Sequence, residues 1–174
     1  MKGTKGSRQG QQHNLSISCP AKVIKNVAGT SSDNDSVGCQ KLNIKTHRRA
    51  NSKLVGTVVA IEDEKYASTR LVATQDMAVD DQGLVHGGFA FGLADLAAMV
   101  LVNQPNVVLA SAEMRYLAPV KVGDEMVADA SLVSKEENRF KVRVEVRVGD
   151  RSVAEGTFNC VVTGRHVLEK RRLP

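Results

Sequence analysis

The stretch from residue 83 to residue 97, GLVHGGFAFGLADLA, contains the residues whose types and spacing could do chemistry. His86 and two glycines stand where an apolar segment begins, and Asp95 is the single acid within that segment. The first N–H groups of a helix lack intrahelical acceptors, so the unobstructed N–H of Gly87 could polarise a carbonyl and hold an oxyanion. A nearby carboxylate can act as a nucleophile or as a general base on water. This combination suits hydrolysis of an activated acyl group.

The spacing of His86 and Asp95 bears on how such a site is assembled. Nine residues at about 100° each bring the second side chain to the opposite side of a helix, so one chain cannot easily aim both groups at one substrate. Two antiparallel helices related by a two-fold axis could place His86 and Gly87 of one chain opposite Asp95 of the other. A carboxylate in an apolar helix costs free energy unless something satisfies it. We therefore expect a homo-oligomer, at least a dimer, with a shared site.

Each of these residues also has a structural explanation. His86 could cap the helix, Gly87 and Gly88 could permit close packing, and Asp95 could form an ion pair with Arg115. Other nucleophilic chemistry is not indicated, because the sequence has no G-x-S-x-G motif and Cys160 lies in a strand pattern without an obvious partner.

The elements around the motif follow from periodicity. A helix is predicted from Gly87 to about Asn103, where NQPN ends it because Pro105 cannot continue a helix. Before it, TVVAIEDEKYASTRLVAT predicts two strands joined at the acidic turn around residues 63 and 64, and QDMAVDDQG is typical of a loop. Four strand-like runs follow the helix.

The clearest of these runs, RFKVRVEVRV, alternates an apolar set from Phe140 to Val148 with charged residues, which predicts a strand with one buried face. Gly149-Asp150 predicts a tight hairpin turn, and EMVADASLV predicts a similar strand after the turn at Gly123-Asp124. Two strands, one long apolar helix and four antiparallel strands indicate an α+β fold. A helix that is apolar nearly all round must be enclosed, so we expect the sheet to wrap around it.

Composition divides the 174 residues into three parts. Residues 1–41 are rich in Gly, Ser, Asn, Gln and Lys without a helical or strand period, so we predict a disordered basic and polar extension. It could be a nucleic-acid-binding arm, an arbitrary extension or the product of an upstream start codon. Residues 42–166 form the expected folded domain, and residues 167–174 a basic C-terminal tail.

Charge and cysteine content favour a cytoplasmic protein that binds an anionic partner. The net charge of +5 favours nucleic acid, a membrane surface or a phosphorylated small molecule. The three cysteines are odd in number and have no metal-ligand spacing, so we expect no disulfide framework, no metal and no cofactor. No apolar run has the length of a membrane span, and no signal-peptide core follows the first residue.

GLVHGGFAFGLADLA, followed by MRYLAPVKVGDEMVADA, resembles the hotdog-fold acyl-CoA thioesterases of the phenylacetate-degradation type over roughly residues 43–164. The shared pattern is His-Gly-Gly, an Asp nine residues after the His, and an aromatic-x-x-Pro-x-x-x-Gly-acid run that contains Tyr116, Pro119, Gly123 and Asp124. The resemblance implies a long central helix wrapped by an antiparallel sheet of five to six strands, with dimers that often pair into tetramers. It also implies hydrolysis of an acyl-CoA thioester to free acid and CoA.

By this resemblance, Gly87 is the oxyanion donor, Asp95 the nucleophile or base from the partner chain, and His86 an orienting or polarising group. Gly88 and Phe89 join the substrate-binding residues. Phe89 and Phe91 could border the acyl group, although Phe89, Phe91, Leu93 and Leu96 equally suit core or dimer packing.

Two positions depart from the pattern of the relatives. Many relatives carry Asn six residues before the His, where this chain has Asp80. Some place Ser or Thr on the strand after the helix to position water; ungapped counting gives Leu109 there, with Ser111 two residues on and expected on the same strand face. Asp80 and Ser111 are therefore candidate substrate-binding residues.

The basic excess has a candidate use in attracting the phosphates of coenzyme A. The candidate residues are Arg139, Lys141, Arg165, Lys170 and Arg171.

A second class of protein also fits part of the chain. ASAEMRYLAPVKVGDEMVADA resembles the ligand-sensing hotdog domain of a bacterial fatty-acid-synthesis repressor, which binds an acyl-CoA without hydrolysing it. Residues 1–41 contain no amphipathic helical pair, which argues against a DNA-binding repressor and a nucleic-acid partner. A related dehydratase is the third alternative, but the Gly87 and Asp95 arrangement favours hydrolysis.

Overall fold

The computed structural model describes residues 42–169, which form two α-helices, one short 3₁₀ helix and six strands. In chain order the elements are α1 (Ser52–Val55), β1 (Thr57–Glu62), β2 (Tyr66–Val72), η1 (Gln75–Met77), α2 (Gly87–Val102), β3 (Val107–Tyr116), β4 (Glu125–Glu136), β5 (Arg139–Val148) and β6 (Arg151–Val162). The predicted extension of residues 1–41, and Lys170 and Arg171, lie outside the described residues.

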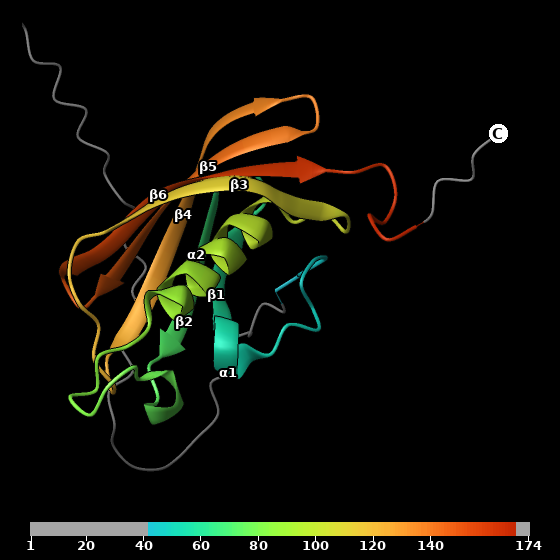
Figure 1. Ribbon diagram of the computed structural model, residues 1–174. Helices are drawn as coiled ribbons and strands as arrows, with labels where there is room; N and C mark the ends of the chain where they lie inside the picture. The colour runs from blue at the N-terminus through green and yellow to red at the C-terminus, as the bar shows by residue number, and fades with distance from the viewer. Residues whose placement is uncertain (1–41, 170–174) are drawn as a thin grey trace, which may run out of the picture. The chain divides into compact units, whose positions relative to one another are not determined.

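One antiparallel sheet encloses the long helix, as the apolar composition of that helix predicts. The strand order is β1-β2-β4-β5-β6-β3, and every neighbouring pair is antiparallel. The sheet curves over α2, which lies along its concave face (Figure 1). β1 and β3 are therefore the two edges of the sheet. No helix within residues 42–169 is long and apolar enough to span a membrane.

The alternating run of residues 140–148 forms β5, and its side chains divide between the two faces as predicted. Phe140, Val142, Val144 and Val146 are buried under the sheet, while the charged residues between them are solvent-facing. The hairpin into β6 turns at Gly149, whose φ of 56° lies in the left-handed region that glycine adopts without strain. The apolar face of β5 thus forms part of the core that receives α2.

Helix α2 is buried along ten of its sixteen residues. Phe91, Gly92 and Asp95 are only half-buried, and they lie near one another along one side because residues three and four apart share a helix face. The helix begins after His86 and ends at Asn103, whose left-handed φ of 48° stops the chain from continuing as a helix. Only one side of α2 is therefore left partly open by the chain's own strands.

Residues 42–50, here called the strap, have no regular structure and are held to the end of α2 by one side chain. Asn103 is completely buried, and its Oδ1 accepts from the backbone N–H of Lys45 at 2.8 Å. Its Nδ2 donates to the carbonyl of Asn43 at 2.9 Å and to Oδ1 of Asp63 at 2.8 Å. Lys45 also pairs with Asp63 at 3.1 Å. Asn103 thereby joins the strap, the β1–β2 turn and the helix end.

Two short helices differ from the predicted elements. α1 was not predicted, and part of the loop-like QDMAVDDQG stretch forms η1. Both are a single turn, too short to show the apolar period that reveals a helix in a sequence.

We predict that Asn103→Ala destabilises the domain by about 2–4 kcal/mol. About 1–2 kcal/mol comes from placing a residue with a Cβ and no compensating bond in the left-handed region. The remainder comes from the lost hydrogen bonds of the Asn103 amide to the Lys45 N–H, the Asn43 carbonyl and the Asp63 carboxylate. Urea unfolding of the two proteins measures the difference.

Asn103→Gly is the matched control, because glycine relieves the backbone strain but cannot form the side-chain bonds. Its stability should fall between those of the wild type and the alanine variant. An alanine variant within about 0.5 kcal/mol of the wild type would show that the strap does not depend on Asn103.

Candidate active site

The imidazole of His86 caps the start of α2. Its Nδ1 accepts from the N–H of Gly88 at 2.9 Å, so the neutral ring carries its proton on Nε2. The preceding turn is held by Asp80, whose Oδ1 accepts from the N–H groups of Gln82 and Leu84 at 3.0 Å each. His86 itself is exposed, and its Nε2–H is the donor that remains for a ligand.

The two glycines leave room for two aromatic rings. A Cβ at Gly88 would lie 2.8 Å from Nδ1 of His86, which the cap does not allow. A Cβ at Gly87 would lie 3.0 Å from the ring of Tyr116, whose hydroxyl donates to the Gly87 carbonyl at 3.3 Å. The Gly87 N–H, the first of the helix, has no acceptor among the described residues. The His-Gly-Gly sequence therefore begins the helix with one free backbone donor, the Gly87 N–H. The ring of Tyr116 packs against Gly87.

A cavity of about 490 Å³ lies at this helix start. His86, Gly87 and Ala90 line one side of it, and the segment from Tyr116 to Val120 lines the other. Asp95 is not among its lining residues. A single chain therefore places His86 next to Gly87 and Asp95 away from both, as the helical spacing predicts.

Asp95 carries a carboxylate that the described residues leave partly unsatisfied. Its Oδ1 is buried and has no hydrogen-bond partner. Burial raises the pKa of this carboxyl above its ordinary value, against a smaller opposing effect of nearby His47. Arg115, the alternative structural partner, pairs with Glu155 at 3.4 Å instead and is 72% exposed. The ion-pair explanation of Asp95 is therefore wrong.

Asp95 lies on the side of α2 that faces β6. Phe91, one helical turn earlier, packs on Phe158 of β6 with ring centroids 5.6 Å apart. Burial raises the pKa of Cys160, also on β6, to about 12, and the negative charge of Asp95 adds to this effect. A thiol with that pKa stays protonated near neutral pH and is a poor nucleophile. Cys160 therefore does not compete with the Asp95 carboxylate as a nucleophile.

The prediction that Ser111 shares a strand face with Leu109 is wrong, because β3 contains a bulge between them. Leu109 pairs with Cys160 and Ser111 with Asn159, which are consecutive and point to opposite faces of β6. Ser111 is exposed, and its hydroxyl accepts from the side chain of Asn159 at 2.9 Å. One extra residue in the strand moved the hydroxyl to the outer face, and ungapped counting cannot detect it.

The remaining predicted residues do not form one cluster. Phe89 contacts His86 edge-to-face at 6.4 Å between ring centroids and lines a separate cavity of about 640 Å³. Arg139 and Lys141 line a cavity of about 350 Å³ with Ser111, and not the one at the helix start. The described residues thus group Gly87, Gly88 and Phe89 with His86, and leave Asp95 apart.

Sequence reasoning missed His47 in the strap. It shares a hydrogen bond with Oγ1 of Thr46 at 2.8 Å and has a φ of 49°, in the left-handed region. His47 is 48 positions before Asp95, and no local pattern links the two. Only the tertiary structure brings its charge near the carboxyl.

Comparison with known proteins identifies the family. Residues 82–155 match the model of the thioesterase superfamily. The chain is 46% identical to the uncharacterized protein PH1136 from Pyrococcus horikoshii, covering 72% of this chain and 95% of that one with a TM-score of 0.70. The chain therefore belongs to the thioesterase superfamily, and its enclosed helix and six-stranded antiparallel sheet are the hotdog fold.

Named relatives differ in what they do. A mutant of the phenylacetic acid degradation protein PaaI from Thermus thermophilus is 27% identical, with a TM-score of 0.59 over 64% of this chain and 97% of that one. The transcription factor FapR of Caldanaerobacter subterraneus is 29% identical over 69% of this chain and 60% of that protein. A methylthioribose-1-phosphate isomerase of Aquifex aeolicus is 45% identical over 67% of this chain and 25% of that protein. The chain thus spans about three fifths of the length of the FapR protein and a quarter of the length of the isomerase.

We predict that His86→Ala and His86→Asn separate the capping role of the side chain from any role of the imidazole. Alanine removes the acceptor for the Gly88 N–H and should lower the free energy of unfolding by about 1 kcal/mol. Asparagine is a good N-cap residue and should keep stability within about 0.5 kcal/mol of the wild type. Thermal unfolding and thiol release from acyl-CoA are measured on the same samples.

If the ring acts on the substrate, both variants lose thiol release, although only one loses stability. An asparagine variant with full activity would show that His86 serves only as a helix cap.

Proposed function

We propose that this protein hydrolyses an acyl-CoA thioester to a free acid and CoA, at a site shared between two copies of the chain. The observation that carries the proposal is the buried Asp95 carboxylate, which has an unpaired Oδ1 and a raised pKa. A purely structural acid would have a partner, because an unsatisfied buried polar atom is costly. Membership in the thioesterase superfamily supports the reaction class.

Three groups divide the reaction between them. The thioester oxygen lies at the free N–H of Gly87, at the positive end of α2. Asp95 of a second copy removes a proton from water, the water oxygen bonds to the carbonyl carbon, and the negative charge moves to the oxygen held by Gly87. Collapse of this intermediate breaks the C–S bond, and the CoA thiolate takes up the proton. Direct attack by the Asp95 carboxylate is the alternative first step, in which water then hydrolyses the mixed anhydride.

The environment of Asp95 suits a base. Burial raises its pKa toward the working pH, which makes the carboxylate a stronger proton acceptor than an exposed one. The free Nε2–H of His86 faces solvent at the helix start, where it can donate to the thioester or orient it. Phe89 and Gly88 border this position, and Asp80 shapes the turn that delivers it.

A binding module that holds an acyl-CoA without hydrolysis is the second candidate function. Its support is the 29% identity with FapR, named as a transcription factor, over 120 residues. The unpaired carboxylate favours hydrolysis, because a sensor has no need for a desolvated base. Thiol release from a panel of acyl-CoAs of varied length and aromaticity separates the two functions.

We predict that Asp95→Asn lowers thiol release by at least about a hundredfold, the usual order for removing a positioned base. Acyl-CoA binding should persist, because it depends on the cavity and the helix start. The fold favours the protonated carboxyl, so wild-type stability falls as the pH rises from the ordinary carboxyl range through the raised pKa. The asparagine variant lacks this loss and should be more stable than the wild type at pH 7.

The stability difference between the two proteins should shrink as the pH falls through the raised pKa toward the ordinary carboxyl pKa. Calorimetric melting and turnover, measured on the same preparation from pH 4 to 8, test both expectations. A stable variant with undiminished turnover would remove Asp95 from the catalytic machinery and favour the binding module.

Mixed oligomers test the shared site. His86→Ala and Asp95→Ala chains should each be inactive as homodimers. In a mixed dimer one of the two sites combines an intact His86 with an intact Asp95, so about half of the wild-type activity per mixed dimer should return. Differently tagged chains, co-expressed and purified through both tags, supply the sample. Mixed dimers as inactive as their parents would mean that both residues act within one chain or that the site is not shared.

A further inference from the structure

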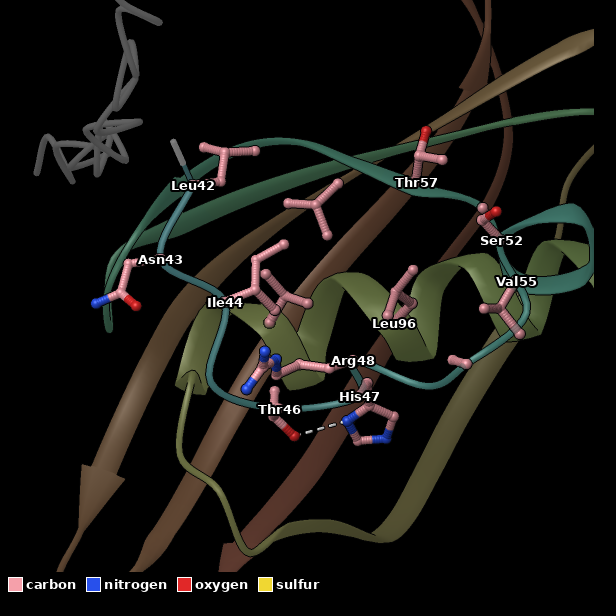
Figure 2. Close-up of a pocket in the computed structure, with 14 residues that line it drawn as sticks. Leu42, Asn43, Ile44, Thr46, His47, Arg48, Ser52, Val55, Thr57 and Leu96 are labelled. Atoms are coloured by element: carbon pink, nitrogen blue, oxygen red, sulfur yellow. Dashed lines mark hydrogen bonds between the residues drawn. The ribbon is translucent and has the colours of Figure 1, made fainter. Parts of the chain in front are cut away.

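A cavity of about 770 Å³ lies between the strap, α1, β1 and the middle of α2. Figure 2 shows Leu96 of α2 beneath it, with Ile44 and Leu42 of the strap and Val55 of α1 around it. Val58 and Val100 complete the apolar lining. Binding pockets for small organic ligands commonly have about 300–1,000 Å³, so the cavity has the size of a ligand site.

The charged side chain that lines this cavity is Arg48. The imidazole of His47 lies beside it in the lining, and none of the described acidic side chains lines the cavity. Within the described part of the chain, Arg48 is exposed and forms no ion pair, a property it shares with Arg49, Arg139 and Arg165, whereas Arg70, Arg115, Arg143, Arg147 and Arg151 each pair with a carboxylate. An unpaired guanidinium beside an aliphatic cavity is complementary to a molecule with a hydrocarbon body and one anionic end.

We propose that this cavity binds an aliphatic carboxylate, with the hydrocarbon chain between the strap and α2 and the carboxylate at Arg48. The aliphatic side chains of Ile44, Val58 and Leu96 supply the apolar surface, and Arg48 supplies the charge. Because Asn103 holds the strap through Asn43 and Lys45, the roof of the site is fixed from the end of α2.

The position of the cavity connects it to the proposed reaction. Leu96, which lines it, follows Asp95 in the helix, and His47, which also lines it, exerts an electrostatic effect on the Asp95 carboxyl. As a statement about substrate class, the inference rests on the proposed function: the cavity holds the acyl chain of the thioester. As a statement about binding, it is independent of hydrolysis.

The test measures binding of decanoate and of uncharged decanol to the full-length protein by isothermal titration calorimetry. We expect saturable binding of decanoate, with one molecule per chain. Val58→Trp fills the cavity and should weaken binding of both ligands at least tenfold. Arg48→Gln should weaken decanoate at least fivefold and leave decanol unchanged, because only decanoate carries the charge that Arg48 contacts.

Val59→Trp is the matched control. Val59 neighbours Val58 in β1, is 53% exposed and does not line the cavity, so this variant should bind both ligands like the wild type. The natural chain has no tryptophan, so the single indole of each variant reports its own environment. Emission of Val58→Trp should be blue-shifted relative to Val59→Trp, which verifies that the cavity is filled in a folded protein.

The outcomes separate this inference from the proposed function. The inference is overturned if the wild type does not bind decanoate. It is also overturned if Val58→Trp and Val59→Trp bind decanoate equally while the emission of Val58→Trp shows that its indole is buried. Decanoate bound by the wild type and lost in Val58→Trp, without thiol release from any acyl-CoA, supports the cavity and overturns the hydrolase. If the protein hydrolyses acyl-CoA, Val58→Trp should shift its preference toward shorter chains, and an unchanged chain-length profile counts against the cavity as the acyl site.

Discussion

The enclosure of α2 is the constraint on which the rest of the structure depends. A sixteen-residue helix with apolar side chains on almost every face cannot border water, so the sheet must curve over it. One chain provides this cover incompletely. Phe91, Gly92 and Asp95 remain half-buried. The strap and α1 cover the helix near Gly92 and Leu96 only by enclosing a cavity. The candidate active site and the ligand cavity both occur where the sheet does not complete the cover.

The two ends of α2 show how one side chain can stop a helix and position other groups. At the start, His86 satisfies the Gly88 N–H, which leaves the Gly87 N–H available for a ligand. At the end, Asn103 adopts the left-handed conformation and uses its amide to hold residues 43 and 45 of the strap. The two caps, at His86 and Asn103, therefore also determine which parts of the helix a substrate could reach: the Gly87 N–H at the start, and the side under the strap.

The sequence predicted the elements whose signals are local and missed those that depend on distant contacts. The alternation in residues 140–148 and the apolar run after His86 gave the strands and the long helix, because burial imposes a period on each. The strap has no such period: its conformation comes from Asn103, 58 residues after Lys45. The bulge in β3 is likewise invisible in composition, and it alone reversed the face expected for Ser111. Asp95 could be recognised because an acid inside an apolar helix is unusual, whereas His47 in a polar strap is not.

The position of Asp95 next to the edge of the sheet explains why the proposed site needs a second copy. Cys160, whose pKa is raised by the charge of Asp95, pairs with Leu109 of β3, and among residues 42–169 no strand lies on the other side of β3. An exposed edge strand offers unpaired N–H and C=O groups to another chain. A second copy paired along β3 would cover the half-buried side of α2 and bring its own helix start toward the unpaired Oδ1. One association would then shield the apolar helix and give the carboxylate the water or thioester on which it acts.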